Sequence, residues 1–137
     1  VESTNRPVPK AIGFVRDGQW RLNPEFENFP LSVVVIAGIP SRAPASTTPI
    51  AHTRGLDSST GQWREAKGDG GGVYGTKGGF IVFLDSHVEF YSNLTDEENM
   101  LVNYNTGEKT SKISEAVPEG ARALSWTGVE WEASRNR

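Results

Sequence analysis

The chain contains no cysteine and only two histidines, His52 and His87, among its 137 residues. Without cysteine, disulfide bonds and thiol catalysis are excluded, whereas a location outside the cytoplasm is not. A triad of serine, histidine and aspartate would have to use one of the two histidines. The sequence holds no Gly-x-Ser-x-Gly segment, which presents the nucleophilic serine of many hydrolases. We therefore assign no catalytic residue from the sequence.

Long hydrophobic runs and clustered charges are also missing. The longest apolar stretch, residues 31–40, is interrupted by Ser32 and Gly38 and is too short to cross a bilayer as a helix. The net charge is −3 and the charged residues are scattered. The sequence therefore contains no basic patch of the kind that binds a nucleic acid, and no such contact is expected.

Glycine and proline are abundant, with 15 and 8 residues, and helical patterns are few. This composition predicts an α+β domain that is rich in β-structure, with an antiparallel sheet and short helices. The length suits one domain with its own core, covering residues 1–137. Within it, residues 1–10 are expected to form an extended arm and residues 127–137 a polar tail.

Apolar runs bounded by turn residues predict the strands. Residues 31–37 include four consecutive β-branched residues and are expected to form the most buried strand before the central hairpin. The pair Asp17-Gly18 predicts a tight hairpin turn. The other strands are expected at residues 11–16, 19–22, 50–53, 62–65 and 121–126.

Helices are expected to be short. Thr95 and Glu98 have the spacing of a capping box, which predicts a helix from Asp96 to about Val102. A second short helix is expected at residues 111–116, ended by Pro118.

The strongest local pattern is a hairpin at residues 78–91. An apolar run, 80–84, precedes the pair Asp85-Ser86, and an alternating segment follows. A two-residue turn would place Phe83 opposite Val88, so that one face of the hairpin carries four core residues. These are Ile81, Phe83, Val88 and Phe90. The run 80–84 is apolar on both faces, which favours an interior position in the sheet.

Ser86 is unusual at this turn. A type I′ turn needs positive φ at both central residues, and serine adopts positive φ at a cost of about 1 kcal/mol. Either the turn is of another type or the flanking strands hold Ser86 in a strained conformation.

This hairpin resembles the C-terminal signature of a family of bacterial pilin-like, or pseudopilin-like, proteins, which is named for a histidine, a nine-residue gap and an Asp-Gly pair. Two positions depart from that signature, since Gly75 stands in place of the histidine and Ser86 in place of the glycine. The similarity continues more weakly through Asn93-Leu94 and residues 110–118 and covers roughly the C-terminal half of the chain. The matching residues are Gly78, Gly79, Phe83, Asp85, His87, Val88 and Phe90.

The resemblance implies the globular head of a non-catalytic structural subunit in a pilus-like or type II secretion pseudopilus-like assembly. Such subunits are exported to the periplasm or cell surface and are anchored in the inner membrane when full length. Their partners are other pilin-like subunits, which they contact through an apolar N-terminal helix. This sequence opens at Val1 without such a helix, and we expect it to be the head alone. No cofactor is implied.

Two functions of other classes remain open. A secreted carbohydrate-binding module would use tryptophan rings to stack on sugars, and a small hydrolase would bring His52 or His87 within reach of serine and aspartate. An exposed coplanar pair of tryptophans would favour the first of these. The tryptophans are Trp20, Trp63, Trp126 and Trp131.

A calcium site and a dinucleotide-binding motif also have simpler interpretations. Asp57, Asp69 and Asp85, with loop carbonyls, could offer oxygen ligands to calcium, which major type II pseudopilins hold in a C-terminal loop, although their spacing fits turn residues better. Residues 70–75 match Gly-x-Gly-x-x-Gly. A dinucleotide site is nevertheless not expected, because a strand rather than a helix is predicted to follow.

Overall fold

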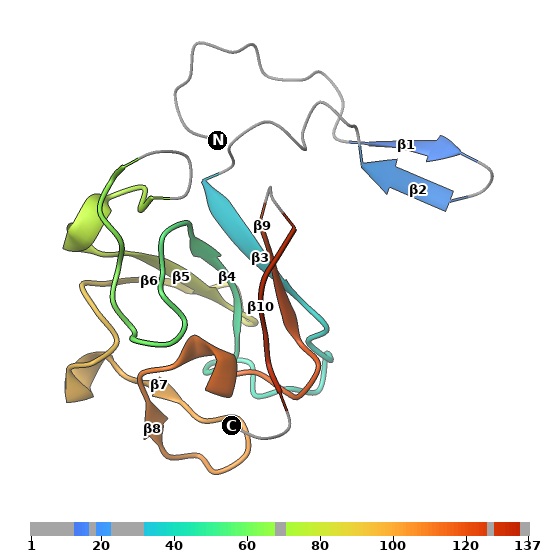
Figure 1. Cartoon of the computed structure of the whole chain (residues 1–137). Helices are drawn as coiled ribbons and strands as arrows, with labels where there is room; N and C mark the ends of the chain where they lie inside the picture. Colours follow the sequence, from blue (N-terminus) through green and yellow to red (C-terminus); the bar gives the residue numbers. More distant parts are fainter. Residues whose placement is uncertain (1–12, 17–18, 23–31, 68–70, 126–127, 135–137) are drawn as a thin grey trace.

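The computed structural model of the chain describes residues 13–16, 19–22, 32–67, 71–125 and 128–134, the first two segments by their backbone. Its main feature is an antiparallel sheet of six strands, as Figure 1 shows. The strands are β3 (Val33–Ala37), β4 (Pro49–Thr53), β5 (Gly79–Phe83), β6 (Val88–Tyr91), β9 (Arg122–Ser125) and β10 (Gly128–Glu132). Across the sheet they follow the order β10-β9-β3-β4-β5-β6. The prediction of a β-rich, antiparallel domain is confirmed.

Smaller elements complete the described chain. A separate hairpin joins β1 (Gly13–Arg16) to β2 (Gln19–Leu22), as the Asp17-Gly18 pair predicts. A second pair joins β7 (Leu101–Val102) to β8 (Lys109–Thr110). The strand expected at 62–65 is reduced to an isolated bridge between Leu56 and Trp63. Helix is limited, in the described residues, to three short 3-10 turns: η1 (Gly75–Lys77), η2 (Glu97–Asn99) and η3 (Ile113–Glu115).

The prediction of a helix from Asp96 to about Val102 is wrong. Its first residues form η2, and the chain then runs extended through Met100 into β7. Thr95 does not cap this turn, whose N-cap is Asp96 without a side-chain bond. Asn93 Oδ1 instead accepts the backbone N–H groups of Thr95 and Asp96, just before the turn, at 3.0 and 2.9 Å. Local side-chain bonds of this kind compete with helix formation. The second expected helix is likewise only η3, and none of the described helical segments is long and apolar enough to span a membrane.

The expected polar tail contains the edge strand β10. Trp131 is buried in the core, and it is brought there by an irregularity in the pairing with β9 between Val129 and Trp131. A bulge adds one residue to a strand and so changes which side chain faces inward. The alternation of polar residues around Trp131 conceals the strand in the sequence.

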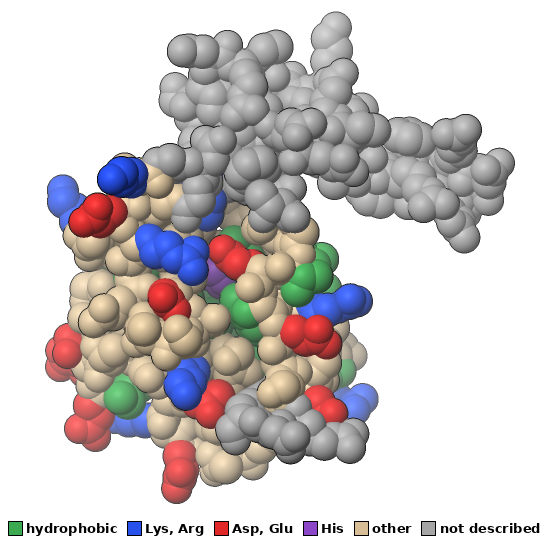
Figure 2. All heavy atoms as spheres, viewed as in Figure 1, with side chains coloured by type: hydrophobic (Ala, Val, Ile, Leu, Met, Phe, Trp, Pro, Cys, Tyr) green, Lys and Arg blue, Asp and Glu red, His purple; other side chains and the backbone are tan. Residues whose placement is uncertain are grey.

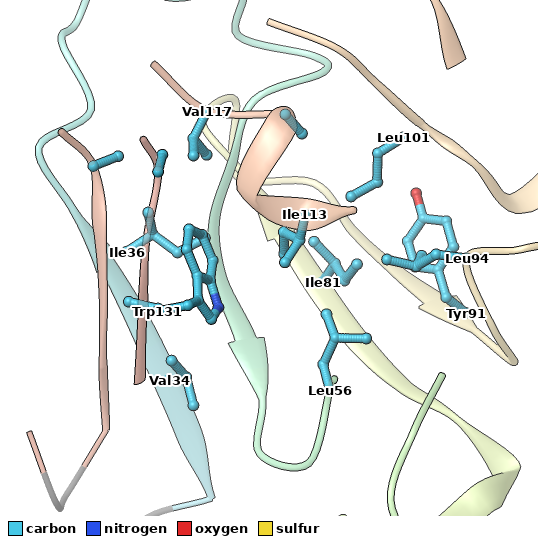
Figure 3. Packing of buried hydrophobic residues seen from close by; sticks show 14 of the residues in the cluster. Val34, Ile36, Leu56, Ile81, Tyr91, Leu94, Leu101, Ile113, Val117 and Trp131 are labelled. Atoms are coloured by element: carbon cyan, nitrogen blue, oxygen red, sulfur yellow. The ribbon is translucent and has the colours of Figure 1, made fainter. Parts of the chain in front are cut away.

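The core lies between one face of the sheet and the loops that hold β7, β8 and η3 (Figure 3). Ile81 of β5 and Ile113 of η3 face one another there, and Leu56 and Leu94 lie beside them. Figure 3 also shows Trp131 packed beside Val34 and Ile36 of β3. We call this the inner face of the sheet, and the opposite one the outer face.

The central hairpin has a different register from the predicted one. Val82 pairs with Val88, and Ile81 pairs with Glu89, so every partner is shifted by one residue. Because side chains alternate along a strand, this shift moves Val88 and Phe90 to the outer face. Ile81 and Phe83 are buried as expected, whereas the prediction that Val88 and Phe90 share their core is wrong. β5 does lie inside the sheet, between β4 and β6.

Candidate functional site

The outer face of the sheet is apolar from edge to edge. One residue from each strand forms a continuous row, which we call the apolar row, because each member is the cross-strand partner of the next. Antiparallel sheets with one covered face usually place polar side chains on the other. The row runs from β10 to β6 as Val129, Leu124, Val35, Ala51, Val82 and Val88.

The apolar row is substantially exposed. Val35, near its centre, has 53% of its surface exposed, and Leu124, Val88 and Val129 are exposed to a similar extent. β3 was predicted to be the most buried early strand, but only Val34 and Ile36 are buried. Large contiguous apolar surfaces are rare on soluble monomers, and those that occur commonly mark interaction sites. A run of four β-branched residues gives no indication that alternate members are exposed, so the sequence does not reveal this surface.

An aromatic cluster extends the apolar row at the β5–β6 end. Phe80 pairs with Phe90, and Tyr74 joins them, with ring centroids 5.1–6.1 Å apart. The rings meet edge to face at 74–75°, so they form no flat platform for a sugar ring. Trp63 and Trp131 are buried, and the side chains of Trp20 and Trp126 lie outside the described residues.

The two glycines of the signature are explained by packing. A Cβ atom on Gly79 would lie 2.5 Å from the ring of Trp63. Gly78 has φ = 131°, and a Cβ there would collide with the carbonyl oxygen of Tyr91. Only glycine allows the backbone to approach so closely. These residues therefore fix how β5 enters the sheet.

The turn of the hairpin has three residues instead of two. Ser86 N–H donates to Phe83 O at 2.8 Å, and Ser86 is the only described non-glycine residue with positive φ, at 75°. This geometry fits a type I turn followed by a left-handed residue, and it accounts for the shifted register. Asp85 accepts hydrogen bonds from His87 N–H at 3.1 Å and from the His87 ring. The backbone bond is the main reason that the pKa of Asp85 lies below its usual value.

His87 lies in the wall of a small cavity between the hairpin and β7. We call it the His87 cavity; its volume is about 170 Å³. Tyr91 Oη donates to Glu89 Oε2 at 2.7 Å, and His87 Nε2 lies 3.9 Å from Glu89 Oε1. Burial and the Glu89 carboxylate raise the pKa of Tyr91, so its hydroxyl stays protonated. The lining residues include Thr47, Phe83, His87, Glu89, Tyr91 and Met100.

A catalytic triad is not assembled among the described residues. Ser46 lines the His87 cavity, but the recorded polar neighbours of the His87 ring are the carboxylates of Asp85 and Glu89. A general base for a serine would need that hydroxyl within hydrogen-bond reach. The described polar contacts of the His87 ring therefore join a histidine to two acids.

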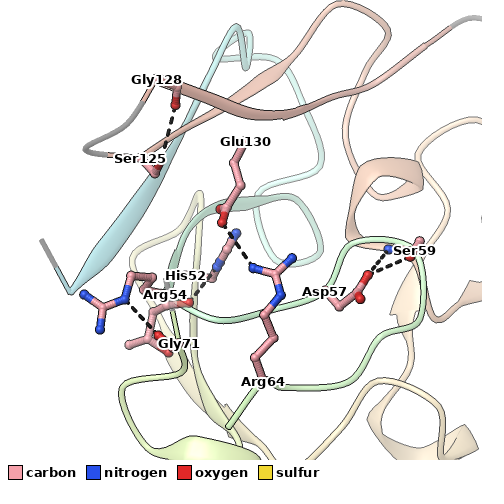
Figure 4. A network of polar contacts seen from close by, with 10 residues as sticks. His52, Arg54, Asp57, Ser59, Arg64, Gly71, Ser125, Gly128 and Glu130 are labelled. Atoms are coloured by element: carbon pink, nitrogen blue, oxygen red, sulfur yellow. Dashed lines mark hydrogen bonds and ion pairs between the residues drawn. The ribbon is translucent and has the colours of Figure 1, made fainter. Parts of the chain in front are cut away.

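His52 lies in a separate, buried position on the inner face of β4. Burial lowers its pKa to about 4, and its Nδ1–H donates to Thr53 O at 2.8 Å. Figure 4 shows His52 near Arg54, Arg64 and Glu130. Arg64 lies 3.7 Å from Glu130, whose pKa is nonetheless raised by burial. His52 Nε2 is buried without a hydrogen-bond partner, so the ring is neutral and structural.

The predicted calcium ligands do not converge in the described chain. No three of its histidine, aspartate or glutamate side chains are grouped to hold a metal ion, and Asp69 lies outside it. Asp57 accepts hydrogen bonds from Ser59 N–H at 2.9 Å and from the Ser59 hydroxyl at 2.6 Å (Figure 4). The bond from the hydroxyl is the main reason that the pKa of Asp57 lies below its usual value. It therefore acts as a turn residue.

The glycine-rich segment is a packing feature. Arg54 Nε donates to Gly71 O at 2.8 Å in a buried contact, and a Cβ atom on Gly72 would lie 2.5 Å from Arg64 O. The segment continues through η1 into β5, so no long helix follows it to bind a pyrophosphate. The segment therefore matches the dinucleotide-binding motif in sequence but lacks the helix that the motif requires.

Comparison of the chain with protein-family models, with curated proteins and with solved structures found no match.

Proposed function

We propose that this domain is the globular head of a non-catalytic, pilin-like structural subunit, and that its outer sheet face is the seat of an apolar helix. In this proposal the subunit is exported, anchored in the inner membrane through that helix, and assembled with other pilin-like subunits into a pilus-like or type II pseudopilus-like fibre. It needs no cofactor and contacts no nucleic acid.

The apolar row carries this proposal. Six apolar side chains in cross-strand register form a surface across all six strands, which is long enough for several turns of helix. Val35, which is 53% exposed, and Ala51 beside it give this surface an apolar centre. Burying such a surface stabilises by about 25 cal/mol for each Å² of apolar area.

The charge distribution supports an apolar occupant. The charged side chains of the outer face lie at one end, where Arg122 of β9 and Glu132 of β10 are cross-strand neighbours. The described surface, part of which is drawn in Figure 2, carries its acidic and basic side chains interspersed elsewhere. A nucleic acid or an anionic membrane surface would instead require a basic patch.

Cysteine cross-linking tests this proposal sharply, because the 137 residues contain no cysteine. Val35→Cys in the full-length subunit should form a disulfide with cysteines introduced at successive positions of the upstream helix. We expect efficient cross-linking at every third or fourth helix position, since those positions share a face. Ser41→Cys, on an exposed loop, is the matched control and should not cross-link.

The upstream coding sequence gives a second test. It should encode a short basic leader and then about 20 apolar residues, the length that spans a bilayer. A cleavable secretory signal directly before Val1, with no retained apolar helix, would overturn the proposal and favour a secreted binding module.

A further inference from the structure

The His87 cavity has a chemistry that the structural role does not use. We propose that it binds an organic cation, namely an ammonium or guanidinium group on a short alkyl chain. The cavity lies on the inner side of β6, beside β7, and is therefore separate from the apolar row on the outer face. The inference is independent of the proposed helix seat.

Glu89 supplies the counter-charge. Its Oε2 accepts the Tyr91 hydroxyl at 2.7 Å, which fixes the direction of the carboxylate. Its Oε1 lies 3.9 Å from His87 Nε2, which is beyond hydrogen-bond distance, so this oxygen of a cavity-lining residue is able to accept a hydrogen bond from a ligand. Asp85 holds the His87 ring through Nδ1, so it orients that wall instead of facing the ligand.

Aromatic and apolar walls complete the site. Phe83 and His87 stack with ring centroids 4.4 Å apart, and Tyr91 lies 6.4 Å from Phe83 at 59°. Aromatic rings attract cations through their electron-rich faces, and because His87 covers one face of Phe83, Tyr91 is the ring expected to make this contact. Met100 and Leu101 form an apolar wall that can pack against methylene groups of the ligand.

The cavity discriminates against ligands of other charge. Its lining residues in the described chain include the carboxylate of Glu89 and no lysine or arginine. An anion would be repelled by the carboxylate, and a neutral ligand of the same shape would gain no charge-assisted hydrogen bond from it. The volume of about 170 Å³ suits the head of an alkylammonium or alkylguanidinium ion better than a large ligand.

NMR titration of the ¹⁵N-labelled chain tests this inference with n-butylammonium, agmatine and a peptide ending in arginine. Each should shift the signals of Thr47, His87 and Met100, while 1-butanol, which has the same length without charge, should not. A peptide that binds at least about tenfold more tightly than agmatine would identify a protein side chain as the source, and the reverse order would identify a free small cation.

Variants decide the role of the carboxylate. Glu89→Gln keeps the acceptor for Tyr91 and should weaken binding of all three cationic probes at least about tenfold. Glu98→Gln, which changes an exposed carboxylate elsewhere, is the matched control and should bind as the native chain does. Equal affinity of Glu89→Gln, equal shifts with 1-butanol, or no shift up to about 20 mM cation would each overturn the inference.

Discussion

Phe83 stacks on His87 across the β5–β6 hairpin, with ring planes inclined by only 9°. The backbone joins the same two residues, because Phe83 N–H donates to His87 O at 3.0 Å. This contact lies directly beside the three-residue turn that accounts for the register of the hairpin. In this register Phe83 lies in the core and Phe90 on the outer face.

Phe83→Ala tests the register through stability. Phe83 is 3% exposed, and removing a buried phenylalanine side chain costs about 3–5 kcal/mol of unfolding free energy. Phe90→Ala is the matched control, since Phe90 is 47% exposed and should cost about 1 kcal/mol through its aromatic contacts alone. Urea denaturation of both variants measures the difference. Equal losses would mean that both rings lie on the same face.

Ser86→Gly is expected to stabilise the domain by about 0.5–1 kcal/mol, because glycine adopts positive φ without the Cβ penalty. Ser86 has φ = 75°. Gly107 has the same φ of 75° with no neighbour near its Cβ position, so Gly107→Ala offers the reciprocal test and should lose about 1 kcal/mol. Chemical denaturation checks both changes. A loss of stability in Ser86→Gly would show that the serine side chain makes a contact of its own.

Gly79→Ala should be clearly destabilising. The added methyl would lie 2.5 Å from the ring of Trp63, which is itself buried, and overpacking of this kind costs about 1–3 kcal/mol. In a Trp63→Leu background the same substitution should cost less, because the smaller side chain can move away, although the methyl would still collide with Thr53 Oγ1. A double-mutant cycle measures this coupling. Additive losses would argue that the indole does not determine the need for glycine.

The sequence predicts the strands better than their register. β4, β9 and the β1–β2 hairpin follow from local apolar runs and turn residues. The turn at Ser86 depends on contacts that lie elsewhere in the chain, since Leu84 N–H donates to Thr48 O at 2.9 Å and Asp85 N–H to Ala45 O at 3.0 Å. No local pattern encodes those bonds.

The candidate sites are hidden for a related reason. The apolar row requires the register of five strand pairs at once, and one slipped pair disperses it between the two faces. The His87 cavity joins β6 to β7 and to the loop at Thr47, which are distant in sequence. Glu89 and Tyr91 alone read as ordinary alternating strand residues.

His52 predicts how stability responds to acid. Its pKa is about 4 in the folded chain, against 6.5 when exposed, so the unfolded chain binds more protons between these values. Stability from this group is complete above pH 6.5 and is lost as the pH falls to about 4. The shift corresponds to about 3 kcal/mol. Burial raises the pKa of Glu130, so the stability that depends on this group falls as the pH rises above the usual pKa of a glutamate. The effects of His52 and Glu130 on stability therefore partly offset each other.

His52→Asn separates these contributions. Asparagine keeps a donor near the position of Nδ1 but does not titrate, so unfolding free energies of the variant should depend less steeply on pH between 6.5 and about 4. Phe90→Ala is the matched control, because it changes an exposed side chain that carries no titrating group and should keep the slope of the native chain. NMR titration of the His52 ring in the native protein provides a second readout, independent of stability. Protonation of the ring near pH 6.5 without unfolding would contradict the lowered pKa. It would mean that the charged ring has a hydrogen-bond partner at Nε2, which is buried and unbonded in the structure.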